Sequence, residues 1–185
     1  MSVTPESDQG TKEQSVPPGT RIGHVHLKVS DLDRAVRFYQ EVMGFDLIIR
    51  YRNQAAFLSA GGYHHHIGLN TWESLGGAPP PPGTTGLYHF AINYPERRDL
   101  AAALKRLLDH GWGIDGASDH GTHEALYLHD PDMNGIELAW DRDPSHWYRN
   151  GEPVFERNPL KFASLLGELG DGEASKYLKA LARYT

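Results

Sequence analysis

Cysteine is absent from the 185 residues of this chain. Without thiols the chain can form no disulfide and can offer a metal no thiolate, so any bound metal must rest on nitrogen and oxygen donors. Long apolar runs are missing too, and none approaches the ~18 residues that a membrane-spanning helix needs. The first twenty residues lack the basic-then-apolar order of a signal peptide. We therefore expect a cytoplasmic protein with no membrane partner.

Positive charge is also scarce. The chain has 18 Lys and Arg against 24 Asp and Glu, a formal net charge of -6. A protein that binds nucleic acid gathers Lys and Arg on one face, and no stretch of this sequence does so. We expect no nucleic-acid partner. With 39% hydrophobic residues, the chain suits a globular domain with a sizeable core.

The same order of predicted elements occurs twice along the chain. Each copy has a strand, an amphipathic helix and three further strands; alternating apolar residues indicate the strands, and three-to-four-residue spacing indicates the helix. The copies cover about 22–70 and 86–140, on either side of a proline-rich loop. The predicted strands are 21–29, 45–51, 55–60, 63–70, 86–94, 112–115, 124–129 and 135–140, and the predicted helices begin near 32 and 99. This repetition predicts an α+β domain built of two βαβββ modules.

The two ends of the chain have a different character. Residues 1–20 are polar and predict a disordered or loosely packed arm. The modular domain is expected over 21–145. Residues 146–185 predict an irregular segment followed by helices, interrupted at the Gly-Asp-Gly of 170–172. This C-terminal segment is expected to cover the core or to form a contact between copies.

Histidine is plentiful, with 11 residues, and two of them open the two modules. His24 and His89 each lie on the first predicted strand of a module, so pairing of the modules would bring them together. Glu137 lies between apolar residues, where an acid is costly to bury without a partner. Two imidazoles and one carboxylate form the ligand set of non-haem iron(II) enzymes that activate oxygen. We therefore predict His24, His89 and Glu137 as ligands of one divalent metal, iron(II) first and manganese(II) as the alternative.

Residues 21–145 resemble the vicinal oxygen chelate superfamily, and specifically its single-domain members similar to catechol 2,3-dioxygenase. The resemblance is carried by IGHVHLKVSDLDRAVRFYQEVMGF, GGYHHHIGLNTW, GLYHFAI and ASDHGTHEALYLHDPDMNGIELAWDR. It implies two paired modules forming a metal-centred pair of half-barrels. It further implies cleavage of a catechol-type aromatic diol with O2 at a bond beside the diol (extradiol cleavage), in a homo-oligomer.

The resemblance assigns roles at matching positions. His24, His89 and Glu137 match the metal ligands of the superfamily. Tyr127 matches a tyrosine ten residues before the ligand glutamate, and His120 adds a further donor to the pocket. The acid–base histidine of extradiol enzymes corresponds best to the middle member of the triplet 64–66, His65, with His64 and His66 as alternatives one register away. His123 stands where a small polar residue is commoner; it either tunes the pocket or is exposed.

The sequence is also compatible with two other functions. A glyoxalase-type lyase or isomerase would place a second carboxylate on the last strand of the first module, and the chain has no acid between Ala55 and Thr71. A binding module of the bleomycin-resistance kind would hold its ligand without metal, and it would not need all three ligand positions filled. The sequence therefore favours the extradiol enzyme over both, although this fold hosts several chemistries.

Overall fold

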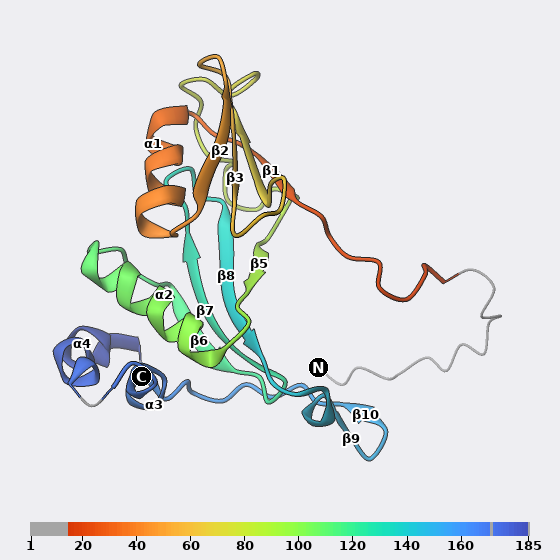
Figure 1. The fold of residues 1–185 in the computed structure, drawn as a ribbon, viewed down its shortest axis with the longest axis vertical. Helices are drawn as coiled ribbons and strands as arrows, with labels where there is room; N and C mark the ends of the chain where they lie inside the picture. Colours follow the sequence, from red (N-terminus) through yellow and green to blue (C-terminus); the bar gives the residue numbers. More distant parts are fainter. Residues whose placement is uncertain (1–14, 171, 185) are drawn as a thin grey trace.

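The computed structural model describes residues 15–170 and 172–184 and has the predicted α+β architecture. Two four-stranded mixed sheets have the same strand order. The first is ordered β1 (Val25–Lys28), β4 (Ile67–Asn70), β3 (Ala55–Ser59), β2 (Asp46–Tyr51), and the second β5 (Phe90–Asn93), β8 (Gly135–Asp141), β7 (His123–His129), β6 (Gly116–Asp119). Figure 1 shows the first module above the second, with the C-terminal helices beside α2 (Arg97–Asp109). The prediction of two βαβββ modules followed by C-terminal helices is confirmed. The first fourteen residues of the predicted arm lie outside the described residues.

The first module begins at β1 (Val25–Lys28) and continues through α1 (Leu32–Arg37), the π-helical turn η2 (Phe38–Val42), β2 (Asp46–Tyr51), β3 (Ala55–Ser59) and β4 (Ile67–Asn70). Asp31 caps α1, because its side chain accepts a hydrogen bond from the backbone N–H of Arg34. The strand predicted over 63–70 begins only at Ile67, so the three consecutive histidines precede β4. The alternation of faces along a strand therefore does not determine where those histidines point.

The second module comprises β5 (Phe90–Asn93), α2 (Arg97–Asp109), β6 (Gly116–Asp119), β7 (His123–His129) and β8 (Gly135–Asp141). The strand predicted at 112–115 is wrong, since β6 lies directly after it. Trp112 lies in a loop and packs against the first module: its ring centroid is 4.6 Å from that of Phe38, and its indole N–H donates to the carbonyl of His129. The apolar residue that suggested a strand is therefore explained by packing of a loop side chain.

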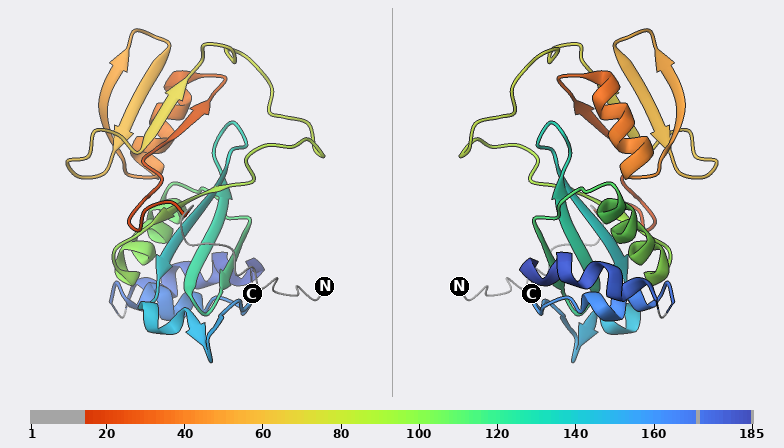
Figure 2. Two further views of the ribbon diagram at one scale, coloured as in Figure 1. Left: turned by 90° about the vertical axis from the view of Figure 1, so that its right-hand side faces the viewer. Right: turned by 90° about the vertical axis from the view of Figure 1, so that its left-hand side faces the viewer.

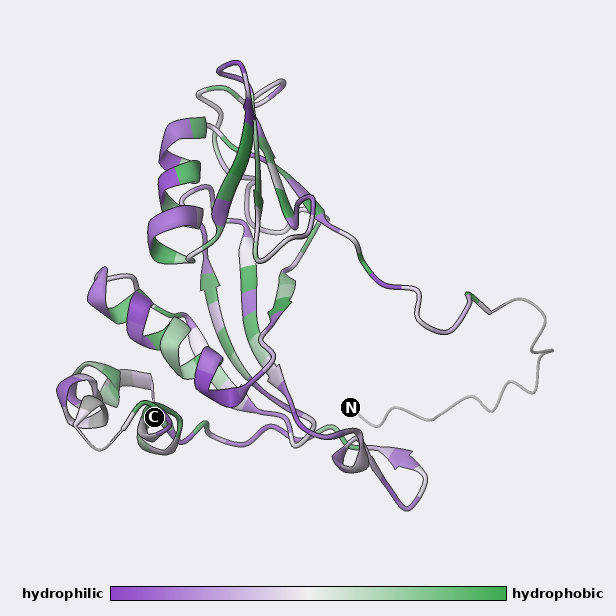
Figure 3. Cartoon of the chain, in the orientation of Figure 1, coloured by the Kyte–Doolittle hydropathy of each residue, from purple (hydrophilic) through white to green (hydrophobic). Residues whose placement is uncertain are grey.

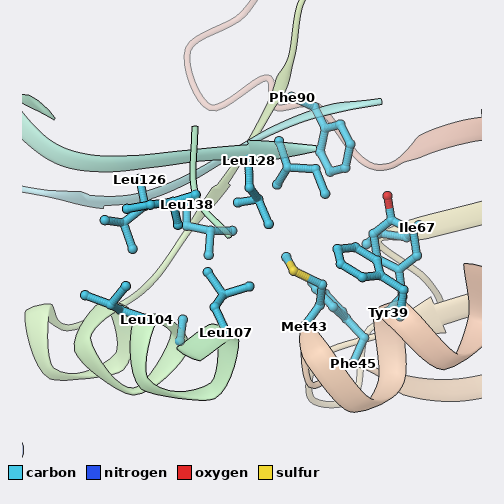
Figure 4. Packing of buried hydrophobic residues seen from close by; sticks show 14 of the residues in the cluster. Tyr39, Met43, Phe45, Ile67, Phe90, Leu104, Leu107, Leu126, Leu128 and Leu138 are labelled. Atoms are coloured by element: carbon cyan, nitrogen blue, oxygen red, sulfur yellow. The ribbon is translucent and has the colours of Figure 1, made fainter. Parts of the chain in front are cut away.

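One hydrophobic core joins the two modules. Leu104 and Leu107 of α2 face Leu126 and Leu138 of the second sheet, and Met43 of the first module approaches the same core (Figure 4). Figure 3 shows that α2 carries apolar residues along one side and polar residues along the other. This amphipathic pattern explains why α2 covers one face of its sheet.

Polar contacts also join the modules at the turn between β7 and β8. The hydroxyl of the fully buried Tyr39 donates to Asp130 over 3.0 Å, and Asp130 also accepts from the backbone N–H groups of Asp132 and Asn134. Arg34 of α1 forms an ion pair with Asp132 over 2.7 Å. The turn that leads into β8 is therefore fixed from the first module.

The chain beyond β8 returns to the second sheet. It forms η3 (Pro144–His146), the short hairpin strands β9 (Tyr148–Arg149) and β10 (Glu152–Pro153), then α3 (Phe162–Gly167), α4 (Glu173–Leu181) and η4 (Ala182–Tyr184). In the views of Figure 2, α3 and α4 lie at the end of the molecule away from the first module. The predicted interruption of the C-terminal helices falls between α3 and α4. No helix within 15–170 and 172–184 is long and apolar enough to cross a membrane.

Candidate metal centre

Glu137 of β8 lies at the centre of a cluster of histidines. The residue as a whole is 7% exposed. Its Oε2 lies 2.9 Å from Nε2 of His89, and its Oε1 lies 3.1 Å from Nε2 of His123. Burial raises the pKa of Glu137, but the hydrogen bond and charge of His123, with the charges of His89 and His120, outweigh burial and leave that pKa below its ordinary value. The carboxylate is therefore ionised at neutral pH and available as a ligand.

A glycine allows His89 to reach Glu137. In the parallel pairing of β5 with β8, Phe90 lies opposite Ile136, so His89 lies one residue before its strand, next to Gly135. A Cβ atom at Gly135 would lie 2.1 Å from the carbonyl oxygen of Tyr88 and 3.1 Å from Cβ of His89. Only glycine permits this approach of the two backbones.

Tyr127 and His120 adjoin this cluster. Tyr127 of β7 lies directly opposite Glu137 in the antiparallel pairing with β8, and its hydroxyl lies 2.8 Å from Nε2 of His120. Nδ1 of His120 lies 2.9 Å from the backbone carbonyl oxygen of Glu156. A carbonyl only accepts, so Nδ1 carries a proton and Nε2 of the neutral ring accepts from the tyrosine.

The Tyr127 hydroxyl keeps its proton over the whole neutral range. Burial, and after it the negative charge of Glu137, raises the pKa of Tyr127 to about 12, against the opposing charge of Arg157. A neutral phenol is a hydrogen-bond donor. Once its O–H turns from Nε2 of His120, the side chain can therefore stabilise an oxygen that gains negative charge next to Glu137.

His24 and His65 lie together in the first module. Their ring centroids are 4.4 Å apart, and Nδ1 of His64 lies 2.7 Å from Nδ1 of His65. His66 instead contacts the end of β3, with its Nδ1 at 3.0 Å from Oγ of Ser59. Among the three consecutive histidines, His65 is thus the one that packs on His24. Burial and then the charge of His24 lower the pKa of His65, which favours a neutral imidazole.

The structure brings together some of the predicted ligands and separates others. His89 and Glu137 are in contact, whereas His24 packs on His65. Within the described part of the chain there is no group of three or more His, Cys, Asp or Glu side chains that could hold a metal ion. The three-ligand set therefore stays a prediction. The donor chemistry nevertheless fits a divalent ion such as iron or manganese, since a buried, ionised carboxylate faces imidazole nitrogens with no thiolate nearby.

Two features of this region were not assigned from the sequence. The sequence leaves two roles open for His123, although its spacing of four residues from Tyr127 along β7 places both side chains on the face of Glu137. A cavity of about 530 Å³ also adjoins the cluster, lined by His89, His120 and Tyr127 and, from the C-terminal segment, by Arg157. The contribution of that segment depends on long-range pairing, which carries no local sequence signal.

These features agree with comparisons against known proteins. Residues 21–138 match the Glyoxalase/Bleomycin resistance protein/Dioxygenase superfamily. The matched range covers the first module and most of the second. The chain belongs to this superfamily. The fold also matches the crystal structure of a glyoxylase/bleomycin resistance protein/dioxygenase domain from Frankia sp. EAN1pec, with a TM-score of 0.56 and 25% identity over 66% of this chain and 98% of that one.

Two curated relatives carry the names of dioxygenases. A catechol-2,3-dioxygenase of Bacillus subtilis is 41% identical over 159 residues, which cover 85% of this chain and 55% of that protein. A biphenyl-2,3-diol 1,2-dioxygenase of Rhodococcus globerulus is 32% identical over 158 residues, 77% of this chain and 80% of that protein. The chain thus spans little more than half the length of the Bacillus relative.

Proposed function

We propose that the protein is an iron(II)-dependent extradiol dioxygenase that cleaves a catechol-type aromatic diol with O2, with manganese(II) as the alternative metal. The observation that carries the proposal is the contact of His89 with the ionised carboxylate of Glu137, at the side of a cavity that also presents Tyr127 and His120. A cavity of about 530 Å³ is within the range of small-molecule sites. The names of the two curated relatives support the same activity.

The proposed metal would be held by His24, His89 and Glu137. When bound, such an ion supplies Lewis acidity toward the two diol oxygens and a redox route between the ring and O2. Two imidazoles and one carboxylate leave coordination positions free for both reactants. Full assembly of this site requires His24 to join the pair that the structure already brings together.

The protein's own residues would handle protons and developing charge. His65, whose pKa is lowered, is suited to accept a proton from the diol, because its neutral form prevails near neutral pH. Tyr127 has a single O–H, which Nε2 of His120 accepts in the structure, because the Glu156 carbonyl fixes the tautomer of that ring. During the reaction the hydroxyl would turn from His120 and donate to an oxygen that gains negative charge.

The equivalence of the two modules argues against a site with two carboxylates. Val25 pairs with Ile67 in β1 and β4 as Phe90 pairs with Ile136 in β5 and β8. Gly68 is therefore the counterpart of Glu137 in the first module. The ring of His26 occupies the space beside it, with atoms 3.0 Å from where a Cβ of residue 68 would lie. This arrangement disfavours the glyoxalase-type alternative.

The proposal is tested by reconstitution with iron(II) under anaerobic conditions, followed by catechol and 4-substituted catechols in air. We expect one equivalent of O2 to be consumed per equivalent of yellow ring-opened product. Manganese(II) reconstitution in parallel distinguishes the two metals. Bound metal with no O2 uptake on any diol would refute the proposal and favour a non-oxidative lyase, and failure to bind metal would favour a metal-free binding module.

A further inference from the structure

Arg157 brings a positive charge to the cavity beside Tyr127. Among the described residues that line this cavity, none is a carboxylate, and Arg157 is the one with a permanent charge. Within 15–170 and 172–184 its side chain makes no hydrogen bond or ion pair with the protein. Its neighbour Glu156 is instead engaged by Arg149 and by the side-chain amide of Asn158. The guanidinium is therefore available to a ligand.

The backbone that carries Arg157 is firmly attached to the second sheet. Asn158 exchanges two backbone hydrogen bonds of 2.9 Å with Asp119 at the end of β6, and the N–H of Glu156 donates to the carbonyl of His120 over 3.1 Å. The contact is close at Gly121, where an added Cβ would lie 2.8 Å from a methyl group of Val154. Arg157 therefore sits at a fixed point of the cavity wall.

We propose that Arg157 binds an anionic substituent, specifically a carboxylate, on the aromatic diol that enters this cavity. The inference rests on the proposed function and deepens it by naming the class of substrate. A guanidinium has the geometry to bind a carboxylate through two parallel hydrogen bonds. In a cavity without competing acids, an anionic ring substituent is attracted, whereas a neutral one gains nothing from this residue.

The position of Arg157 relative to Tyr127 follows from the cavity itself. Both residues line this cavity, and Tyr127 lies directly opposite Glu137 in the pairing of β7 with β8. A small aromatic molecule in the cavity can therefore contact the guanidinium and the Tyr127 hydroxyl together.

The test compares acids with esters of the same shape. The substrates are 3,4-dihydroxybenzoate and 3-(3,4-dihydroxyphenyl)propionate, each beside its methyl ester, with the metal-reconstituted full-length protein. The variants are Arg157→Gln and, as a matched control, Arg98→Gln, which removes an exposed arginine of α2 outside the cavity. We expect Arg157→Gln to lower kcat/KM for at least one acid by about tenfold or more, a typical effect for a lost charge-assisted hydrogen bond. Its effect on the esters, and any effect of the control, should stay below about twofold.

Binding is measured separately from turnover, by anaerobic calorimetric titration of metal-free and metal-loaded protein with the same acids and esters. The dissociation constant of the preferred acid should rise in Arg157→Gln in proportion to the loss in kcat/KM. Equal losses for acid and ester, or acid binding that does not depend on Arg157, would overturn the inference while leaving ester cleavage as support for the dioxygenase. Arg157-dependent acid binding without cleavage of any diol would uphold the inference and refute the proposed function.

Discussion

The buried hydrogen bond between Tyr39 and Asp130 offers the sharpest test of how the two modules are held together. The change Tyr39→Phe removes one hydroxyl and leaves the ring in place, so it creates no cavity. Tyr39 is fully buried, and its hydroxyl donates over 3.0 Å to Asp130, which is 2% exposed. A matched change exists at the surface, where Tyr177 donates to Asp109 in an exposed pair.

The magnitude follows from burial. A hydrogen bond to a charged acceptor contributes about 1.5–3 kcal/mol, and an acceptor left buried with one donor fewer keeps its desolvation cost. We expect Tyr39→Phe to lower the free energy of unfolding by about 2 kcal/mol. For a chain of this size that corresponds to a decrease in Tm of about 4–8 °C. Tyr177→Phe should stay within about 0.5 kcal/mol, because water replaces the lost partner.

Urea denaturation, monitored by circular dichroism, measures both variants. The expected result is a lower midpoint for Tyr39→Phe at an unchanged slope. A loss below about 0.5 kcal/mol, equal to that of Tyr177→Phe, would show that the remaining donors to Asp130 suffice and that the contact does not couple the modules.

The pH dependence supplies a second, independent signature. Burial, followed by the charge of Asp130, raises the pKa of Tyr39 well above its ordinary value. An unfolded tyrosine loses its proton near pH ~10, whereas the folded one keeps it, so above that pH the folded state binds more protons and stability falls as pH rises. The phenylalanine variant lacks this decrease. The difference in unfolding free energy between wild type and Tyr39→Phe should therefore shrink from pH 9 to pH 11; a constant difference would contradict the raised pKa.

Three further changes test the site. Gly135→Ala should lower the free energy of unfolding by several kcal/mol and weaken metal binding, because its Cβ would lie only 2.1 Å from the Tyr88 carbonyl oxygen. The control Gly167→Ala has open space around its Cβ and should raise the free energy of unfolding by about 0.5–1 kcal/mol. Thermal or urea unfolding measures both, and similar costs for the two variants would refute the close approach at Gly135. His89→Ala should abolish both bound metal, measured by elemental analysis, and O2 uptake, and metal retained at wild-type stoichiometry would exclude His89 as a ligand. His65→Phe should keep the metal and lose most of the turnover; loss of metal would instead assign a ligand role to that position.

Much of the fold could be predicted from sequence because both modules follow simple periodicities. The alternation in β7 and β8 and the spacing of apolar residues in α2 come from burial of one face, a property that each segment carries locally. Prediction was wrong where a loop is buried, as at Trp112, and where an apparent strand begins late, as before Ile67. In both cases contacts with other elements decide the backbone, and the segment itself does not encode them.

The residues of the candidate site were likewise predictable only in part. His89 was predicted from its place in the repeat and Glu137 from its apolar neighbours, and the structure brings the two into contact. His123 was recoverable from its position on the face of Tyr127. Arg157 was not, because its place in the cavity depends on pairing between chain segments some forty residues apart, Asp119 and Asn158. Such a pairing uses main-chain atoms and leaves no trace in side-chain pattern.

That main-chain attachment has a consequence for diversity among related proteins. Residues 156–158 are joined to the end of β6 through N–H and C=O groups that every amino acid except proline provides. The C-terminal segment can therefore accept new side chains at this point without losing its attachment to the second sheet, while His89, His123 and Glu137 stay as they are. Exchanging the C-terminal segment between homologues should therefore change ligand preference while leaving the candidate metal-binding residues of the two modules unchanged.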